Sequence, residues 1–278
     1  MRRRILRAMP EPTASRSDGA SPDLTQAVAG TRFREVRWFA SLDSTNRSLV
    51  DEAAGGAAPG LVVVADEQTA GRGRLGRSWV APQGASLLVS VLLDGGAPPD
   101  ERHLALVAAA LAAVDAVDVH CGFRPQLKWP NDLVVGDRKL AGLLAEATGS
   151  GAVVVGMGLN VDWDSFPPEL EQTATSCNRE GRPARREELL VTWLHELDRR
   201  LAALGADGPA AIHADHIAAS ATLGRRVRVE RARSAFENTV LEGEAVALTE
   251  LGHLVVQTGD GVTHTVSAGD VVHLRPAV

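Results

Sequence analysis

The sequence predicts an α+β protein with two domains, a larger one that combines helices with a mixed or antiparallel sheet and a small all-β one. Apolar runs of strand length recur through the first part of the chain and alternate with segments of helical apolar period. From Leu223 on, only short alternating strands with glycine-containing turns remain. A chain of 278 residues, 45% hydrophobic and 23% charged, is long enough for both domains.

We expect domain boundaries near residues 30 and 221. Residues 1–30 are rich in Arg, Pro, Ser and Ala and show no sustained period, which predicts a disordered tail. Residues 31–221 would form the larger domain. Residues 222–278 are too few for a β-sandwich and suit an SH3-like β-barrel.

The larger domain is predicted to begin with a strand at residues 33–39 and a short helix. SLDSTNRSLVDEAAGG offers Asp43 or Ser44 as the helix cap, and Gly55 and Gly56 as its end. A long core helix, a strand meander and two further helices follow the basic loop described next, as their apolar periods indicate. These later elements are expected at residues 101–122, 126–161, 183–204 and 207–219.

A basic glycine-rich loop, GRGRLGRSW at residues 71–79, separates two buried strands that begin at Leu61 and Ser86. It is not a dinucleotide-binding fingerprint, because Pro82 and Gly84 interrupt the chain before a helix can begin. Arginine offers a planar fork of donors to an anion, and glycine lets the backbone approach a ligand closely. The loop is therefore suited to close around an anionic group, and a solvated basic turn is the alternative.

Composition excludes several classes of function. A net charge of −6 and a pI of about 5.8 argue against a protein that coats nucleic acid or an anionic membrane. No uninterrupted apolar run approaches the ~20 residues that a membrane span needs. Cys121 and Cys177 lack the spacing of a zinc site and suit a reducing compartment. We therefore expect a cytoplasmic protein without a DNA or membrane partner.

Polar clusters occur at predicted strand ends and loops of the larger domain, where ligand sites usually lie. Ser44, Thr45 and Asn46 open a helix whose free amides and dipole favour a polar or anionic group, with plain helix capping as the alternative. Gln68 precedes the basic loop. These residues are candidates for ligand binding.

Two further clusters lie in the predicted meander. In KWPND, Asp132 could hold Mg²⁺ with help from Asn131, since Mg²⁺ takes one or two carboxylates together with phosphate oxygens; a plain turn is the alternative. In KLAGLLAE, strand alternation puts Lys139 and Gly142 on opposite faces. Lys139 could point into a pocket or, as most lysines do, reach solvent.

The chemistry of these clusters is limited. The histidines show no metal-site spacing, and no GxSxG motif or Ser/His/Asp order occurs, so hydrolytic and metal-centred functions are disfavoured. The clusters supply cations for a polyphosphate, an acid for Mg²⁺ and apolar walls, but no nucleophile. This inventory suits nucleotidyl transfer onto a substrate that carries its own carboxylate nucleophile.

The order of the motifs STN, EQTAGRGRLGRSW, KWPNDLVVGDRKLAGLLAE and GMGLN resembles that of the biotin–protein ligases, over residues 33–274. GRGRxGRxW, KWPND and KxxGxLxE in this order form a specific signature. The resemblance implies a catalytic domain of the biotin/lipoate ligase type and an SH3-like C-terminal domain. It also implies that biotin and ATP form biotinyl-5′-AMP, which then acylates one lysine of the biotin carboxyl carrier domain of an acyl-CoA carboxylase.

The resemblance also assigns roles to residues at matching positions. Lys139, Arg74 and Asp132 would be catalytic, with Lys139 at the biotin carboxylate and the α-phosphate and Asp132 at Mg²⁺. Biotin would be bound by Ser44, Thr45, Asn46, Gln68, Gly71, Arg72, Gly73, Arg74, Lys139, Gly142 and Leu144. ATP would be bound by Arg74, Arg77, Trp79 (on adenine), Lys128, Asn131, Asp132, Lys139 and Asn160 (at the adenine edge).

Two other functions stay open from the sequence. A lipoate–protein ligase shares the architecture and the adenylate chemistry but not GRGRxGRxW and KWPND. A non-catalytic biotin-responsive regulator would need a DNA-binding segment, and the roughly thirty residues before the first strand are not expected to form the winged helix-turn-helix of bifunctional members. The sequence therefore predicts a ligase without repressor function, and it leaves a homodimer open.

Overall fold

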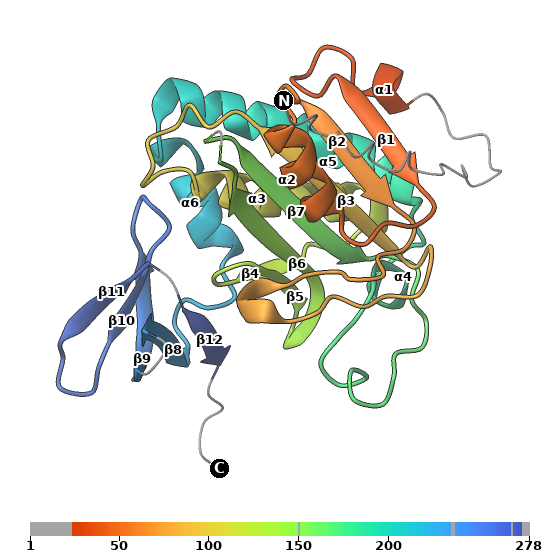
Figure 1. The fold of residues 1–278 in the computed structure, drawn as a ribbon. Coiled ribbons are helices and arrows are strands. Elements are labelled where there is room, and N and C mark those ends of the chain that lie inside the picture. The colour runs from red at the N-terminus through yellow and green to blue at the C-terminus, as the bar shows by residue number, and fades with distance from the viewer. Residues whose placement is uncertain (1–23, 150, 235–236, 268, 274–278) are drawn as a thin grey trace, which may run out of the picture.

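The larger module is built on one seven-stranded sheet (Figure 1). Its strands are β1 (Glu35–Phe39), β2 (Leu61–Ala65), β3 (Ser86–Leu93), β4 (Gln126–Lys128), β5 (Asp132–Val135), β6 (Arg138–Ala147) and β7 (Val153–Asn160). The order is β1-β2-β3-β7-β6-β5-β4, with β1 and β2 parallel and all other neighbours antiparallel. The predicted mixed sheet is confirmed. The computed structural model describes residues 24–149, 151–234, 237–267 and 269–273.

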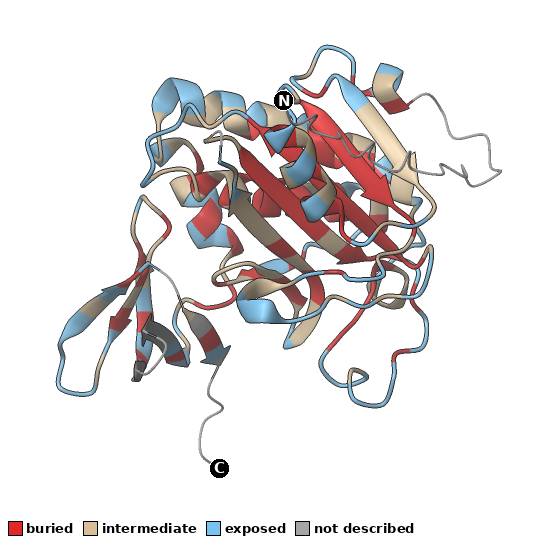
Figure 2. Ribbon diagram, in the orientation of Figure 1, coloured by how far each residue is buried: buried red, intermediate tan, exposed pale blue. Residues whose placement is uncertain are grey.

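Helices cover both faces of this sheet (Figure 1). One face packs against α3 (Leu104–Cys121) and α5 (Arg186–Asp207), and the other packs against α2 (Thr45–Ala54) near β2 and β3. Two further helices are α4 (Cys177–Glu180) and α6 (Ala210–Ala219). Figure 2 shows that buried residues run through β2, β3 and β7 while the outer faces of the helices are exposed. The core therefore lies on both sides of the central strands.

The helix α3 is the core helix that the sequence predicts. It is long and apolar enough to cross a membrane, but 67% of it is buried within the protein. A hydrogen bond also links α3 to α5: the indole Nε1 of Trp193 in α5 donates to the backbone carbonyl of Ala109 in α3 at 2.9 Å. The apolar length of α3 is thus explained by packing between the sheet and α5.

The prediction of a disordered tail over residues 1–30 is wrong for residues 24–30. Leu24–Ala27 form the single-turn helix α1, and the side chains of Leu24 and Val28 pack with Phe33 in the main core, with Val28 fully buried. One turn is too short to produce a readable helical period, which is why the pattern did not reveal it. The part of the expected tail at residues 1–23 lies outside the described residues.

The C-terminal module is a five-stranded antiparallel sheet, as its alternating pattern predicts. Its strands are β8 (Arg226–Ser234), β9 (Glu237–Leu248), β10 (Leu254–Gln257), β11 (Thr263–Val266) and β12 (Asp270–His273), in the order β11-β10-β9-β8-β12. A separate apolar core includes Val227, Val229 and Val256. Among the described strands β11 and β12 do not pair, so closure into an SH3-like barrel is not confirmed.

Trp129 connects the two modules. Its ring belongs to the apolar core of the C-terminal sheet, and its Nε1 donates to the carbonyl of Gly252 at 3.0 Å. Its backbone N–H donates to Oγ1 of Thr222 at 3.0 Å. The aromatic residue of KWPND therefore holds the C-terminal sheet against the larger module, a role that the sequence did not indicate.

Candidate functional site

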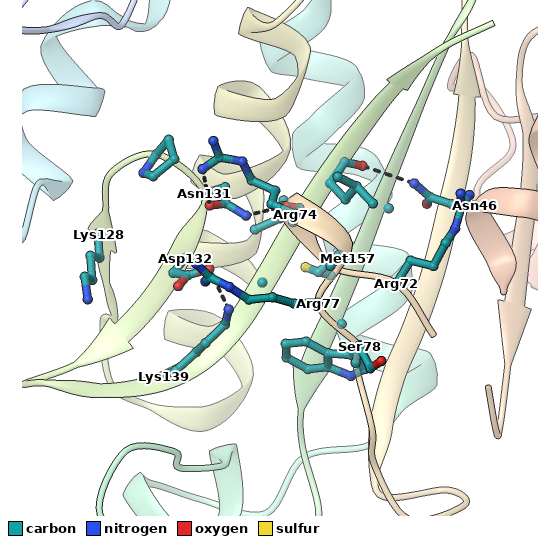
Figure 3. A pocket seen from close by; sticks show the side chains of 18 of the residues that line it. Asn46, Arg72, Arg74, Arg77, Ser78, Lys128, Asn131, Asp132, Lys139 and Met157 are labelled. Atoms are coloured by element: carbon teal, nitrogen blue, oxygen red, sulfur yellow. Dashed lines mark hydrogen bonds and ion pairs between the residues drawn. The ribbon is translucent and has the colours of Figure 1, made fainter. Parts of the chain in front are cut away.

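A cavity of about 300 Å³ brings most of the predicted site residues together (Figure 3). Those that line it are Ser44, Thr45, Asn46, Gln68, Arg72, Gly73, Arg74, Arg77, Trp79, Lys128, Asn131, Asp132, Lys139, Gly142 and Leu144. Lining residues that sequence reasoning missed are Ser78, Trp129, Pro130, Leu143, Gly156, Met157, Gly158, Val271 and Val272. The last two belong to β12, so the C-terminal sheet contributes to one wall.

Glycines of β6 and β7 form the floor of this cavity. Gly142 pairs with Gly158 across the two strands, and a Cβ at Gly158 would lie 2.5 Å from Cε2 of Trp79. A Cβ at Gly156 would collide with Oδ1 of Asn46. The indole and the amide can thus lie directly on the strand backbone only because these side chains are missing. Glycines two residues apart in a strand are a signal of such close approach, and GMGLN carries it.

One end of the cavity is neutral and hydrogen-bonded. The backbone N–H of Thr45 donates to Oε1 of Gln68 at 2.8 Å. Oγ of Ser90, on β3, lies 2.7 Å from Oγ1 of Thr45 and 2.6 Å from Oδ1 of Asn46. Nδ2 of Asn46 donates to Oε2 of Glu146 at 2.8 Å. Thr45, Asn46 and Ser90 are all buried, so this end is formed before any ligand arrives.

Ser44 begins α2 at this neutral end. Its side chain caps the helix by accepting the N–H of Arg47 at 3.5 Å, and it is buried. The capping alternative is therefore correct for Ser44, although the residue also lines the cavity. The cap places the helix N-terminus, with its partial positive charge, toward the cavity.

The other end of the cavity is charged. Nζ of Lys139 pairs with Oδ1 of Asp132 at 2.7 Å and lies 5.5 Å from the ring centroid of Trp79. Nη1 of Arg74 donates to Oδ1 of Asn131 at 3.2 Å. Burial lowers the pKa of the Arg74 guanidinium, and the nearby charge of Asp132 opposes that shift. Figure 3 shows Lys128, Asp132 and Lys139 on the side of the cavity opposite Asn46 and Arg72.

A β-bulge brings Lys139 to the same side as Gly142, so the simple alternation predicted for β6 is wrong. Leu133 pairs with Ala141 and Val134 pairs with Lys139, which leaves Leu140 as one extra residue on β6. Leu140 accordingly lies in the main core. An extra residue reverses the facing of everything beyond it. Lys139 points into the pocket, and its side chain is 37% exposed.

The basic loop is folded over the neutral end. The N–H of Trp79 donates to the carbonyl of Gly71 at 2.9 Å, which closes the loop at its base. Gly71 does not line the cavity, and a Cβ there would collide with the Trp79 carbonyl. Nη2 of Arg72 pairs with Oε2 of Glu146 at 2.9 Å. At the tip, Leu75 is 67% exposed with a positive φ of 54°, a conformation that costs energy in a non-glycine residue.

Asn160 is not brought to the cavity. It is buried, its Oδ1 accepts the hydroxyl of Ser86 at 3.2 Å, and its Nδ2 donates to the carbonyl of Thr175 at 2.9 Å. The segment that contains Thr175 covers this end of β7. The expected contact of Asn160 with the adenine edge therefore has no support from its position.

The donors available to a metal are few. In the described parts of the chain, no group of three or more His, Cys, Asp or Glu side chains could hold a metal ion. Asp132 is the acidic residue among those that line the cavity. One carboxylate fits Mg²⁺ that arrives with a nucleotide, because the remaining ligands are then phosphate oxygens and water.

Comparison with known proteins decides the family. The biotin/lipoate A/B protein ligase family matches residues 38–163, and the biotin protein ligase C-terminal domain matches residues 222–274. The biotin–[acetyl-CoA-carboxylase] ligase of Mycobacterium tuberculosis is 39% identical over 255 residues, which cover 89% of this chain and 92% of that protein. The chain belongs to the biotin protein ligase family. The resemblance predicted from the motif order is confirmed.

Other members of the biotin protein ligase family support the same conclusion. The biotin–[acetyl-CoA-carboxylase] ligase of Paracoccus denitrificans is 35% identical over 219 residues, covering 74% of this chain and 88% of that one. The structure of the Aquifex aeolicus biotin protein ligase in complex with biotin and ATP has a TM-score of 0.75 and 26% identity, covering 87% of this chain and 100% of that chain. The fold of this family member is therefore that of solved biotin protein ligases.

Proposed function

We propose that this protein activates biotin with ATP to give biotinyl-5′-AMP and then transfers biotin to a lysine of the biotin carboxyl carrier domain of an acyl-CoA carboxylase. One observation carries the proposal: the neutral hydrogen-bonding end and the charged end face each other within one cavity, over a floor of glycines. Biotin has the same division, with a neutral ring system at one end and a carboxylate at the other. Membership of the biotin protein ligase family supports the match.

Biotin would lie with its ring system at the neutral end. Thr45, Asn46 and Gln68 offer donors and acceptors whose partners are already arranged, so few new groups must be ordered on binding. Its carboxylate would then point along the floor toward Lys139. Gly142 leaves the space for it, since a Cβ there would lie 3.0 Å from Nζ of Lys139.

The first step needs a cation between two anions. Lys139 would sit between the biotin carboxylate and the α-phosphate and stabilise the charge that develops on the phosphoryl oxygens. Asp132, which now neutralises Lys139, would turn to the Mg²⁺ that accompanies ATP. Arg74, Arg77, Lys128 and Asn131 would contact the phosphates, and Trp79 would pack against adenine.

The second step needs protection of the mixed anhydride from water. The basic loop would close over the adenylate, with Arg72 and Arg74 neutralising its phosphate. The amine of the carrier lysine would attack the acyl carbon, forming the amide while AMP leaves with the bonding electron pair. This order of events explains why a loop with several glycines carries the arginines.

We also propose an SH3-like closure for the C-terminal sheet and a cytoplasmic location. The strand order, in which β12 returns to pair with β8, supports the first. Cys121 and Cys177 are both buried and form no disulfide, which fits a reducing compartment and supports the cytoplasmic location. The sequence leaves a homodimer open, and measuring the mass in solution by light scattering tests it.

The proposed function is tested by mass spectrometry of a purified carrier domain after incubation with this protein and Mg-ATP. With biotin, one lysine should gain the mass of one biotinyl group. A parallel incubation with lipoate should leave the carrier unchanged, and omission of ATP should abolish the product. Modification by lipoate alone, or no modification with biotin, would overturn the proposal.

A further inference from the structure

Glu146 occupies a junction that the proposed catalytic steps do not use. It lies near the end of β6, does not line the cavity, and has a side chain that is 27% exposed. Its Oε2 accepts from two groups at once, Nδ2 of Asn46 at 2.8 Å and Nη2 of Arg72 at 2.9 Å. One carboxylate oxygen thus joins the buried neutral end to the basic loop.

The carboxylate is one of two groups that set the direction of the Asn46 amide. An ionised carboxylate can only accept, so Asn46 must turn its NH₂ group to Glu146 and its Oδ1 away. Oδ1 then accepts the hydroxyl of Ser90, which lies 2.6 Å away. The carbonyl of Leu144, 3.4 Å from the same Nδ2, can also only accept, so Glu146 and the backbone of β6 together hold the Asn46 amide in this orientation.

The far side of the network is fixed by other groups. The hydroxyl of Thr45 lies 2.7 Å from Oγ of Ser90 and donates to Oε1 of Gln68 at 3.1 Å. Oε1 of Gln68 also accepts the backbone N–H of Thr45 at 2.8 Å. The NH₂ group of Gln68 is therefore left to donate to a different partner. Thr45 therefore sets the direction of the Gln68 amide, and Glu146 acts on the network through Asn46.

We propose that Glu146 is a positioning residue that holds the Asn46 amide at the neutral end and ties the basic loop to it. The inference rests on the proposed function, in which the neutral end receives the biotin ring system. Asn46 lines the cavity, so a carboxylate that holds its amide in place also shapes the surface that meets the ring system. The pairing with Arg72 places the loop and the binding surface under the control of the same carboxylate.

Glu146→Gln tests this hold on Asn46 with little change of volume. A glutamine keeps the shape of the side chain but loses the negative charge that strengthens the hydrogen bonds from Asn46 and Arg72. We expect the Kd for biotin, measured by calorimetry without ATP, to rise at least about tenfold, the scale of one lost hydrogen bond to a charged group. The KM for ATP should change by less than about threefold, and the melting temperature should stay near that of the parent.

Glu196→Gln is the matched control. Glu196 lies on α5, away from the cavity, and pairs with Arg199 at 2.7 Å with a side chain that is 31% exposed. It therefore loses a comparable ion pair, and biotin binding should stay as in the parent. Glu146→Asp, which keeps the charge, should bind biotin more tightly than Glu146→Gln.

The Arg72→Ala background separates the network from the loop. If Glu146 orients Asn46, Glu146→Gln weakens biotin binding in this background as well. Disappearance of the effect there would show that Glu146 does not act through Asn46, and equal losses for biotin and ATP together with a lower melting temperature would also overturn the inference. A parent protein that binds no biotin contradicts the proposed function itself, whereas a parent that binds and a Glu146→Gln variant that binds equally well contradict only this inference.

Discussion

The two ends of the cavity differ in how their polar groups are satisfied. At the neutral end, Thr45 is 4%, Asn46 5% and Ser90 0% exposed, and each has a hydrogen-bond partner within the protein. At the charged end, the side chains of Lys139 and Asp132 are 37% and 24% exposed. Neutral polar groups can be buried when they are fully paired, whereas burying charges costs far more. The neutral end is thus preformed, and the charged end is left for ligand and Mg²⁺ to complete.

The largest effect is expected from Lys139→Ala at the charged end. Adenylation should slow by at least the ~10²-fold typical of losing one transition-state donor, while the melting temperature changes little because no large apolar volume is removed. Lys139→Arg should also be impaired, since a planar fork does not replace a compact ammonium. Pyrophosphate release in single turnover measures the step. Adenylate formation at the parent rate in Lys139→Ala would show that the lysine only pairs with Asp132.

The floor glycines allow the two ends to be disturbed separately. Gly156→Ala puts a methyl group against Oδ1 of Asn46, so it should weaken biotin binding by roughly 10- to 100-fold, as expected for breaking one or two buried hydrogen bonds. Gly158→Ala meets the Trp79 ring and should instead raise the KM for ATP by about three- to tenfold.

Gly149→Ala is the control for both glycine variants, because a Cβ there meets no atom within 4 Å. Calorimetry with biotin and initial rates with varied ATP separate the two effects. Equal losses of biotin and ATP binding in both variants would mean that the floor acts as one unit and that the division into two ends is not functional.

A smaller effect is expected from the loop arginines, which connect the ends. Arg72→Ala and Arg74→Ala should release biotinyl-5′-AMP several-fold faster, because each removes a charged side chain whose contacts are partly solvated. Escape of labelled adenylate from the preformed complex is the measurement. Release at the parent rate would exclude the loop as the element that retains the intermediate.

The smallest effect on either end of the cavity is expected from a substitution of His216. This residue lies on α6, behind the charged end and between the two modules. Burial, and then the neighbouring His213 and His103, lower its pKa to about 4. The unfolded chain binds this proton near its ordinary pKa of about 6.5, so stability from neutral His216 is complete above that pH. It is lost progressively as the pH falls from about 6.5 to about 4.

His216→Gln should therefore flatten the decrease in the free energy of unfolding between those pH values, with activity at neutral pH within about twofold of the parent. Denaturant titrations at several pH values measure this. An equally steep decrease in the variant would assign the acid sensitivity to other groups at the junction, such as His273, whose pKa burial also lowers to about 4.

Much of the fold and the site could be predicted because the signals are local. The mixed sheet, the core helix and the all-β C-terminal module follow from apolar periods that report which residues can be buried. The candidate ligand residues were found because cations, glycines and carboxylates gather in short motifs. The single turn α1 gave no such signal, since one turn has no period.

The sequence by itself determined which chemical groups the site would contain, because those are properties of residue type and order. Only the tertiary structure decided which groups meet. The bulge at Leu140 turns Lys139 toward Gly142. The carbonyl of Thr175 accepts the side-chain amide of Asn160 and keeps it from the cavity. Glu146 joins Asn46 to Arg72. These outcomes depend on strand register and on pairs of residues far apart in the chain. No local pattern encodes them, because a shift of one residue in register reverses every facing without changing the composition.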